Sequence, residues 1–362
     1  MTPRLHTVDP RRDPTVAPER APELLTMLLR HAVLAPSRHN SQPWLFEIEG
    51  PELCVYADEG RALPAADPDG RERAMACGAA LHNVEVAALH HGHASSVEIF
   101  SGARKDGLLA RLTLEERRAP GPLDEALFAA ISARRTNRLA FDSREPPAGL
   151  LCALAREAAG LGAALQVVEH GVRPAVAELV AEGDRIEWSS PRFRAEVAAW
   201  SRENAPGARD GMPGYAQGLS ESAAVLHRLF VRFRADVSGE ERRDRHYALH
   251  TRALLVLSTS SDRGADWVAA GRALQRVLLL AAAHGLSASY FSQAVEVPRL
   301  RARLREAIGE RGHPQLLFRL GFGRTLSPTP RRPPEEVLRS VRPTAPERAL
   351  MGPITGAHAH SP

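Results

Sequence analysis

Short apolar runs alternate along the chain with longer segments whose apolar residues recur at helical spacing. Leu24, Leu25, Leu28 and Leu29 show that spacing and predict a helix over 22–34. Two apolar runs separated by a Gly-Pro turn predict a β-hairpin. All the expected strands are 45–48, 53–56, 96–100, 109–115, 165–169, 253–258, 287–292 and 315–321, and the further helices are 72–91, 123–133, 148–158, 265–284 and 298–308.

Two of the expected helices share a sequence pattern. The segments that begin at Gly78 and Gly271 lie 193 residues apart and have eight identities in 19 aligned positions. In both segments the expected helix ends in His-Gly, so Gly92 and Gly285 are predicted helix C-caps. A period of this length indicates a duplicated domain and excludes a solenoid repeat.

The duplicated pattern predicts two fused domains that share the expected helices and strands. We expect the first domain over 21–120 and the second over 121–340. Residues 174–235 are expected to form a mostly helical stretch, interrupted by a Gly- and Pro-rich loop at 204–215. The segments 1–20 and 341–362 are expected to be disordered tails.

Composition narrows the choice of ligand and compartment. A hydrophobic content of 44% with 25% charged residues is typical of a soluble globular protein. Only Lys105 among the 47 basic residues is a lysine, so an anion site must use Arg or backbone N–H groups. The net charge of +4 is not gathered into a basic stripe, so we expect no nucleic-acid partner. The longest apolar run, 277–283, is too short to span a bilayer, so we expect no membrane partner. Three cysteines without a CxxC pair favour the cytoplasm, and the spacing of the histidines predicts no metal site.

Two polar clusters interrupt the apolar pattern. Residues 35–44 read Ala-Pro-Ser-Arg-His-Asn-Ser-Gln-Pro-Trp, between the first expected helix and strand. Residues 134–138 read Arg-Arg-Thr-Asn-Arg, after the expected helix 123–133. The counterpart of the first cluster in the second half, 158–165, has no polar side chain, and we find no arginine cluster opening the first half. Each half has therefore lost the polar cluster that the other half keeps.

These clusters resemble the motifs of the nitroreductase family. That family opens with Arg-x-Ser-x-Lys/Arg, which 134–138 matches with Thr136 in place of Ser, and it carries Ala-Pro-Ser-x-x-Asn-x-Gln-Pro-Trp, which 35–44 matches at every fixed position. The chain is most similar, over roughly 20–340, to the double-length Acg-type branch with two fused nitroreductase-like domains. The resemblance implies an α+β fold in which each domain is an antiparallel-rich sheet flanked by helices. Residues at about 190–250 exceed what a simple nitroreductase has at this point, which implies a lid-like insertion in the second domain. Ordinary members exchange these motifs across a dimer to build two FMN sites. The resemblance thus implies one FMN site, complete in one chain, so that a monomer can hold the cofactor, and a lost mirror site.

The resemblance also assigns roles to residues. Arg134, Arg138 and Thr136 would hold the FMN phosphate together with Arg331, while Ser37, Arg38 and Asn40 would bind the pyrimidine edge of the ring. Gln42 could contact the ligand or brace the loop. Ser292 and Gln293 stand where family members, which commonly have Glu-Gly, place backbone amides near the flavin N5. The complete predicted set is Pro36, Ser37, Arg38, Asn40, Gln42, Arg134, Arg135, Thr136, Arg138, Ser292, Gln293 and Arg331.

The activity implied by the resemblance is FMN-dependent oxidoreduction. In a ping-pong reaction NAD(P)H would reduce the flavin, leave, and be replaced by a small acceptor such as a nitro compound or a quinone. The Ser-Gln departure and the insertion favour an alternative, a non-catalytic protein that binds or sequesters FMN under a lid. A flavin-free scaffold is disfavoured by the retained arginine cluster, and no protein general acid is evident from the sequence.

Overall fold

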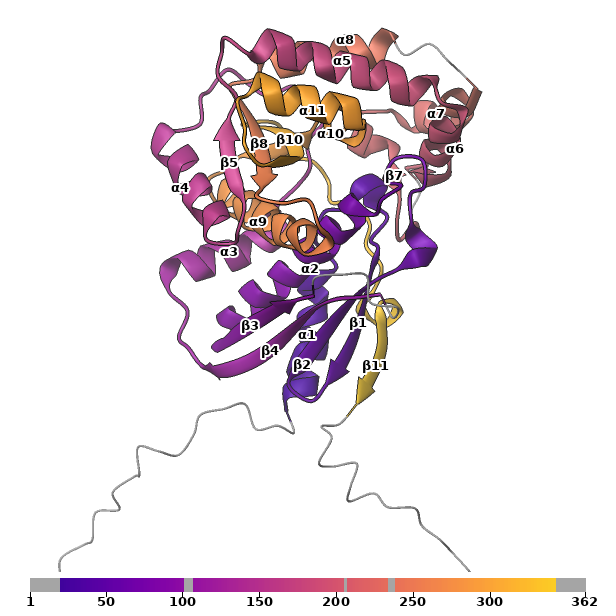
Figure 1. The fold of residues 1–362 in the computed structure, drawn as a ribbon. Coiled ribbons are helices and arrows are strands. Elements are labelled where there is room, and N and C mark those ends of the chain that lie inside the picture. Colours follow the sequence, from indigo (N-terminus) through magenta and orange to yellow (C-terminus); the bar gives the residue numbers. More distant parts are fainter. Residues whose placement is uncertain (1–19, 101–106, 205–206, 234–237, 343–362) are drawn as a thin grey trace, which may run out of the picture.

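The computed structural model describes residues 20–100, 107–204, 207–233 and 238–342. Two mostly antiparallel sheets lie in separate halves of the molecule, and long helices pack between them (Figure 1). The expected tails lie outside the described residues, apart from residues 20, 341 and 342. Within the described ranges, every helix falls short of the length and apolarity that crossing a bilayer requires.

The first sheet contains the predicted hairpin. Strand β1 (Trp44–Glu49) pairs antiparallel with β2 (Glu52–Ala57), because Gly50 adopts a left-handed φ of 55° in the turn between them. The sheet continues through β4 (Leu108–Arg117) to β3 (His93–Ile99). Alternate residues of β1 are buried, as expected for a strand with one face on the core. Helix α1 (Ala21–Ala32) packs on this sheet through its leucines.

The second sheet repeats the order of the first. Strands β5 (Ala164–Val167), β8 (Ala253–Thr259), β10 (His313–Gly321) and β9 (Ser287–Tyr290) correspond in order to β1, β2, β4 and β3. Helices α3 (Pro122–Ala133) and α4 (Ala148–Ala159) precede this sheet. The predicted strand 287–292 is two residues too long, because residues 291 and 292 turn into the short helix α10 (Gln293–Glu296), which α11 (Pro298–Ala307) follows.

The duplicated helices α2 (Arg71–His90) and α9 (Gly264–Ala283) cross at the centre of the fold. A Cβ on Gly78 would overlap the carbonyl oxygen of Val268, and a Cβ on Gly271 would overlap that of Met75. Met75 and Val268 are also 193 residues apart, so the two contacts are equivalent under the internal repeat. The crossing therefore needs glycine at both positions, and Gly92 and Gly285 end the helices with φ of 82° and 77° as predicted.

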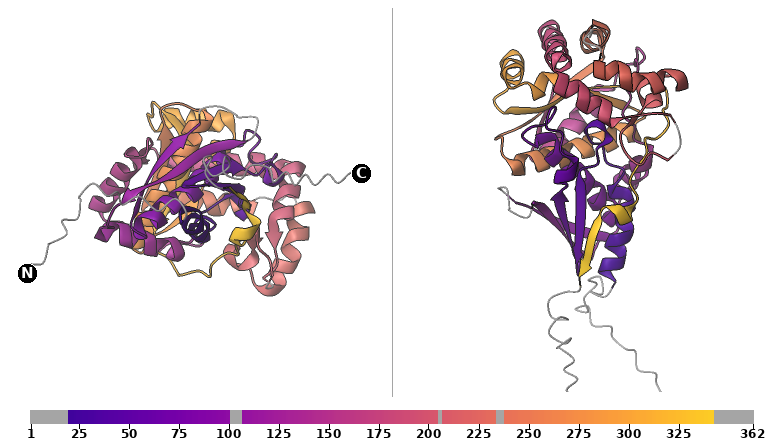
Figure 2. Two further views of the ribbon diagram at one scale, coloured as in Figure 1. Left: turned by 90° about the horizontal axis from the view of Figure 1, so that it is seen from below. Right: turned by 90° about the vertical axis from the view of Figure 1, so that its right-hand side faces the viewer.

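A helical insertion separates β5 from β8, where the first half has only the short turn between β1 and β2. Its elements are α5 (Arg173–Ser189), α6 (Pro191–Trp200), β6 (Ser201–Arg202), β7 (Met212–Pro213), α7 (Glu221–Phe233) and α8 (Ser238–His250). The inserted chain thus begins with α5, before the expected start at about 190. Figure 2 shows its helices along one side of the second half and over its far end.

The C-terminal segment of the second half returns to the first half. After β10 the chain crosses the molecule and adds β11 (Leu338–Arg342) parallel to β1 as the fifth strand of the first sheet (Figure 1). The Phe46 N–H donates to the Val337 carbonyl at 2.8 Å at the start of this pairing. We call residues 322–337 the C-terminal arm, since they tie the two halves together and pass beside the first polar cluster.

Candidate functional site

Two adjoining cavities lie where the halves meet. The arginine cavity, of about 270 Å³, is lined by Arg134, Arg135, Arg138 and Arg331. The acidic cavity, of about 250 Å³, is lined by Glu72, Asp184, Glu187, Glu240 and Asp244. Both have walls made by Pro36, Ser37, Thr136, Arg138 and Met212. The two cavities thus share one boundary, to which the first cluster, the arginine cluster and the insertion all contribute.

The arginine cavity carries positive charge without a matching anion. Among the described residues, none of its four guanidinium groups forms an ion pair with a carboxylate. Nε and Nη1 of Arg134 and Nε of Arg331 are buried and have no hydrogen-bond partner in the described part of the chain. Burial, with Arg134 and Arg135 nearby, lowers the pKa of Arg331 to about 9. Since unpaired buried charge is costly, this cavity is built for an anion.

Residues 134–138, the arginine motif, are held at the end of α3 against the second sheet. Thr136 forms a parallel bridge with Ala288, and the Asn137 N–H donates to the Ala288 carbonyl at 2.8 Å. The fully buried Asn137 side chain donates to the Arg324 carbonyl at 3.0 Å. Asn137 was absent from the predicted site set, although it lies inside the motif. Its role is to fix the backbone that carries the arginines.

Arg134 and Arg331 meet at one backbone atom of the first half. Their Nη2 groups donate to the Leu34 carbonyl at 3.3 and 3.4 Å, just before the motif loop, which we define as residues 35–44. Arg331 Nη1 also donates to Asn40 Oδ1 at 2.9 Å. The two clusters, about a hundred residues apart in the sequence, are therefore joined in the folded chain.

The motif loop has an uncommon backbone. His39, Asn40 and Gln42 have φ of 51°, 55° and 52°, in the left-handed region that non-glycine residues rarely adopt. Such residues cost about 1–3 kcal/mol each, and they persist only where their surroundings hold them. Two proline rings flank this stretch in sequence. The loop is held in a strained shape at the wall of both cavities.

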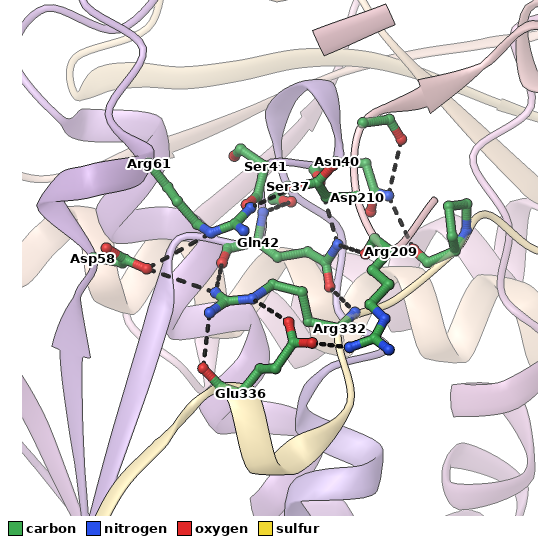
Figure 3. Close-up of polar contacts among 12 residues, drawn as sticks. Ser37, Asn40, Ser41, Gln42, Asp58, Arg61, Arg209, Asp210, Arg332 and Glu336 are labelled. Atoms are coloured by element: carbon green, nitrogen blue, oxygen red, sulfur yellow. Dashed lines mark hydrogen bonds and ion pairs between the residues drawn. The ribbon is translucent and has the colours of Figure 1, made fainter. Parts of the chain in front are cut away.

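Two amide side chains hold that shape (Figure 3). Asn40 Nδ2 donates to the carbonyls of Gly211 and Pro330, each at 3.0 Å. Gln42 is fully buried: its Nε2 donates to the Arg209 carbonyl at 2.8 Å, and its Oε1 accepts the Arg332 N–H at 2.8 Å. Gln42 lines neither cavity, so the structure places it as a brace of the loop, one of the two roles that the sequence left open.

Ion pairs extend this bracing into the insertion and the C-terminal arm (Figure 3). Arg332 lies 3.6 Å from carboxylate oxygens of both Asp58 and Glu336. Arg61 contacts Asp210 at 3.0 Å and donates to the Ser41 carbonyl at 2.8 Å. The arm that delivers Arg331 is thereby anchored by its neighbour Arg332.

Arg38 lines the acidic cavity but is surrounded by carboxylates. Its guanidinium group pairs with Glu296 and lies 3.6 Å from Glu187 and 3.7 Å from Glu72. Its charge is therefore balanced by the protein itself. Arg138, which lines both cavities without an ion-pair partner in the described part of the chain, is the cation available to a ligand at the shared boundary.

The predicted residues are brought together by the fold. Eleven of the twelve line one or both cavities, and Gln42 lies directly behind them. Ser292 and Gln293 lie at the start of α10, in the wall of the acidic cavity.

Sequence reasoning missed the acidic residues Asp184, Glu187 and Asp244 of the insertion. Their only signal was the spacing of Asp184 and Glu187 on one face of an expected helix. Among the described residues, no group of three or more His, Cys, Asp or Glu side chains is arranged to hold a metal ion.

Fold and site define an internally duplicated α+β protein with a two-part cavity, one end of which is built for an anion. No family model matches the chain. It is 32% identical over 330 residues to "Putative NAD(P)H nitroreductase Rv3131" of Mycobacterium tuberculosis, covering 88% of this chain and 93% of that protein. It is 31% identical over 324 residues to "Putative NAD(P)H nitroreductase acg" of the same organism, covering 87% and 95% of the two chains.

The chain belongs to the nitroreductase family, and the likeness spans nearly the full length of both relatives. The solved FMN-dependent nitroreductase NfnB of Mycobacterium smegmatis, in complex with NADPH, is 18% identical with a TM-score of 0.39 and covers 60% of this chain and 98% of that chain. The motif resemblance and the predicted α+β fold of two fused nitroreductase-like domains are confirmed.

Proposed function

We propose that this protein is an FMN-dependent NAD(P)H oxidoreductase whose FMN site is complete within one chain. The observation that carries the proposal is the set of guanidinium groups in the arginine cavity that lack an anionic partner in the described structure. An FMN phosphate brings about two negative charges and three acceptor oxygens, which match this deficit. The names of the relatives as NAD(P)H nitroreductases support the choice of electron donor.

The residues present fit FMN in one orientation. Arg134, Arg331 and the Thr136 hydroxyl would hold the phosphate, with Arg135 at the rim. The ring would cross the shared boundary beside Ser37 and extend into the acidic cavity. Arg138 would face the polar pyrimidine edge, where a cation stabilises negative charge on the ring. This is the role that the sequence assigned to Arg38.

FMN, when bound, would supply ping-pong electron transfer from the nicotinamide to a nitro compound or a quinone. The protein's part is to hold the ring, limit the access of water and control protons at the acceptor. Met212 of the insertion lines both cavities and would lie against the ring. Backbone amides at Ser292 and Gln293, in the wall of the acidic cavity, would face the reactive edge.

Flavin content and reducibility test the proposal. Purified protein should retain or take up one FMN per chain, and NADPH without oxygen should bleach its absorbance, which an added quinone should restore. Arg134→Ala should weaken FMN binding by about 1.5–3 kcal/mol, since it removes a charge-assisted contact. Arg118→Ala, at an exposed position beyond β4, is the matched control. A colourless protein that cannot be reconstituted with FMN would refute the proposal.

One observation favours a second function, non-catalytic binding of FMN. Residues 209–212 of the insertion are bound to Asn40 and Gln42 of the motif loop, beside both cavities. A protein closed in this way could retain FMN without admitting a nicotinamide. One FMN per chain without bleaching by NADH or NADPH would establish that function instead.

The same site predicts the stoichiometry. The counterpart of the motif loop in the second half, 158–165, offers no polar side chain to a ligand. We therefore propose one FMN per chain in a monomer. Two flavins per chain, measured by absorbance and protein assay, would contradict the loss of the mirror site.

A further inference from the structure

The acidic cavity owes its character to the insertion. Asp184 and Glu187 of α5 lie three residues apart on one helix face, and both line the cavity. Helix α8 adds Glu240 and Asp244 to the same wall. A group of carboxyls thus borders the space into which the flavin ring and the second substrate would fit.

Helix α5 sits directly on the segment predicted to approach the flavin N5. A Cβ on Gly183 would lie 2.7 Å from the Gln293 carbonyl oxygen, closer than real Cβ contacts, so only glycine allows this approach. The approach brings Gln293 Nε2 to 3.1 Å from Asp184 Oδ1 and 3.5 Å from Asp244 Oδ2. Gln293 thereby fixes the orientation of the Asp184 carboxyl.

The other oxygen of Asp184 is free. Oδ2 is buried and has no hydrogen-bond partner among the described residues, and only 4% of the residue is exposed. Burial, Asp244 and Glu187 together raise the pKa of Asp184 to about 8, against the opposing effect of Gln293 and Arg243. The raised pKa favours the protonated form of the Asp184 carboxyl at neutral pH. The charged and titratable groups that face this region from the packed elements are Arg38, His39, Glu72, Arg138, Glu187, Glu240, Arg243, Asp244, Tyr247, Tyr290 and Glu296.

Glu187 holds its proton less firmly than Asp184 does. Its carboxylate lies 3.6 Å from the Arg38 guanidinium group, which favours its charged form. Burial nevertheless raises the pKa of Glu187 to about 7. Asp184 has no such cation in contact among the described residues and keeps an unpartnered oxygen.

We propose that Asp184 is the general acid that delivers a proton to the second substrate, an acceptor with a quinone or nitro oxygen. The inference rests on the proposed function and adds to it a catalytic residue that the insertion supplies. Gln293 is a positioning residue, since it donates to Oδ1 and leaves Oδ2 without a partner among the described residues. The nitroreductase-like halves alone would lack this acid, because it comes from α5.

The proton balance of the step is complete. Reduced flavin, when bound, supplies two electrons and one proton as a hydride. The Asp184 O–H bond breaks as an O–H bond forms on the acceptor, so a quinone leaves as the neutral quinol. With a nitro group, the same two electrons and two protons yield a nitroso group and water. Asp184 is left as a carboxylate and recovers its proton from solvent.

Separate half-reactions test the proposal. FMN-loaded protein is reduced with NADPH without oxygen and then mixed with menadione in a stopped-flow instrument over a range of pH. Reoxidation by the wild type should be flat below about pH 8 and slow above it, because the acid loses its proton. Asp184→Asn should reoxidise about 100-fold more slowly without that break, since general acids contribute about 10²–10⁴-fold. Its reduction by NADPH and its FMN affinity should stay at the wild-type values.

Glu178→Gln is the matched control, because Glu178 lies on α5 with its side chain about half exposed and pairs with Arg245 outside the cavity. It should reoxidise at the wild-type rate with the wild-type pH profile. A second measurement needs no turnover: the infrared difference between wild type and Asp184→Asn without FMN should show a protonated carboxyl at pH 7.

Each result decides one claim. Normal reduction followed by unaltered reoxidation of Asp184→Asn, or an ionised Asp184 at pH 7, would overturn the inference alone. Failure to bind FMN or to accept electrons from NADPH would overturn the proposed function, and this inference with it. Wild-type FMN affinity in the variant excludes misfolding as the cause of slow reoxidation.

Discussion

Replacing Gly271 with alanine tests the helix crossing at the centre of the duplicated fold. The added Cβ would overlap the carbonyl oxygen of Met75, a backbone atom of α2 that cannot move without its helix. Overpacking of this kind costs about 1–3 kcal/mol and occasionally more. Alanine recovers about 1 kcal/mol as a better helix former than glycine. Because the clash is with buried backbone, we expect a net loss near the upper end, about 2 kcal/mol.

Urea unfolding followed by far-ultraviolet circular dichroism measures this loss as a lower midpoint at unchanged slope. Gly149→Ala is the control, since Gly149 is exposed in α4 and a Cβ there would meet no atom within 4 Å. It should be neutral or stabilising. Gly78→Ala, the equivalent change under the repeat, should cost about as much as Gly271→Ala. Equal stability of the Gly271 and Gly149 variants would refute the close crossing.

Three further predictions concern the site. Asp184→Asn should stabilise the protein increasingly as pH rises from about 4 to 8. The folded chain holds the Asp184 proton to about pH 8, whereas the unfolded chain releases it near 3.8. If the urea-derived stabilities of variant and wild type changed in parallel with pH, the raised pKa would be contradicted. Arg331→Ala should reduce the stabilisation of the protein by added FMN, since it removes a cation from the arginine cavity. An unchanged FMN-induced shift of the melting temperature would count against the phosphate site. Asn40→Ala should lower the free energy of unfolding by about 1–3 kcal/mol, because the carbonyls of Gly211 and Pro330 lose their donor. A urea midpoint equal to that of the wild type would show that the motif loop does not need the Asn40 side chain for its stability.

Most of the fold could be predicted because its signals are local. The β1–β2 hairpin follows from two apolar runs around a Gly-Pro turn, and it forms with the expected pairing. Helices α2 and α9 follow from the repeated Ala-rich segments, and both end at glycines with positive φ. The repeat in these helices was enough to indicate duplication, and both sheets share one strand order.

The candidate site was predictable in part. Motif matching selected residues from two distant segments, and the fold places them around shared cavities. Their contact with FMN stays a prediction. The same reasoning assigned Asn40 to the ligand, and this stays a prediction. The structure adds that the amide side chain of Asn40 bonds to the insertion and to the C-terminal arm, which the motif does not indicate. A motif shows which residues occur together, but the partner of each polar atom depends on segments far away in the chain.

The sequence by itself determined the duplicated α+β pattern, the motif loop, the arginine motif and the family. Only the tertiary structure decided that β11 completes the first sheet, that Arg38 is neutralised by three carboxylates, and that α5 carries Asp184 into the cavity. These features join residues between 34 and 293 positions apart, so no local period or motif encodes them. Burial then sets the chemistry: the carboxyl of Asp184 is an ordinary acid in the sequence and becomes a neutral proton donor only inside the fold.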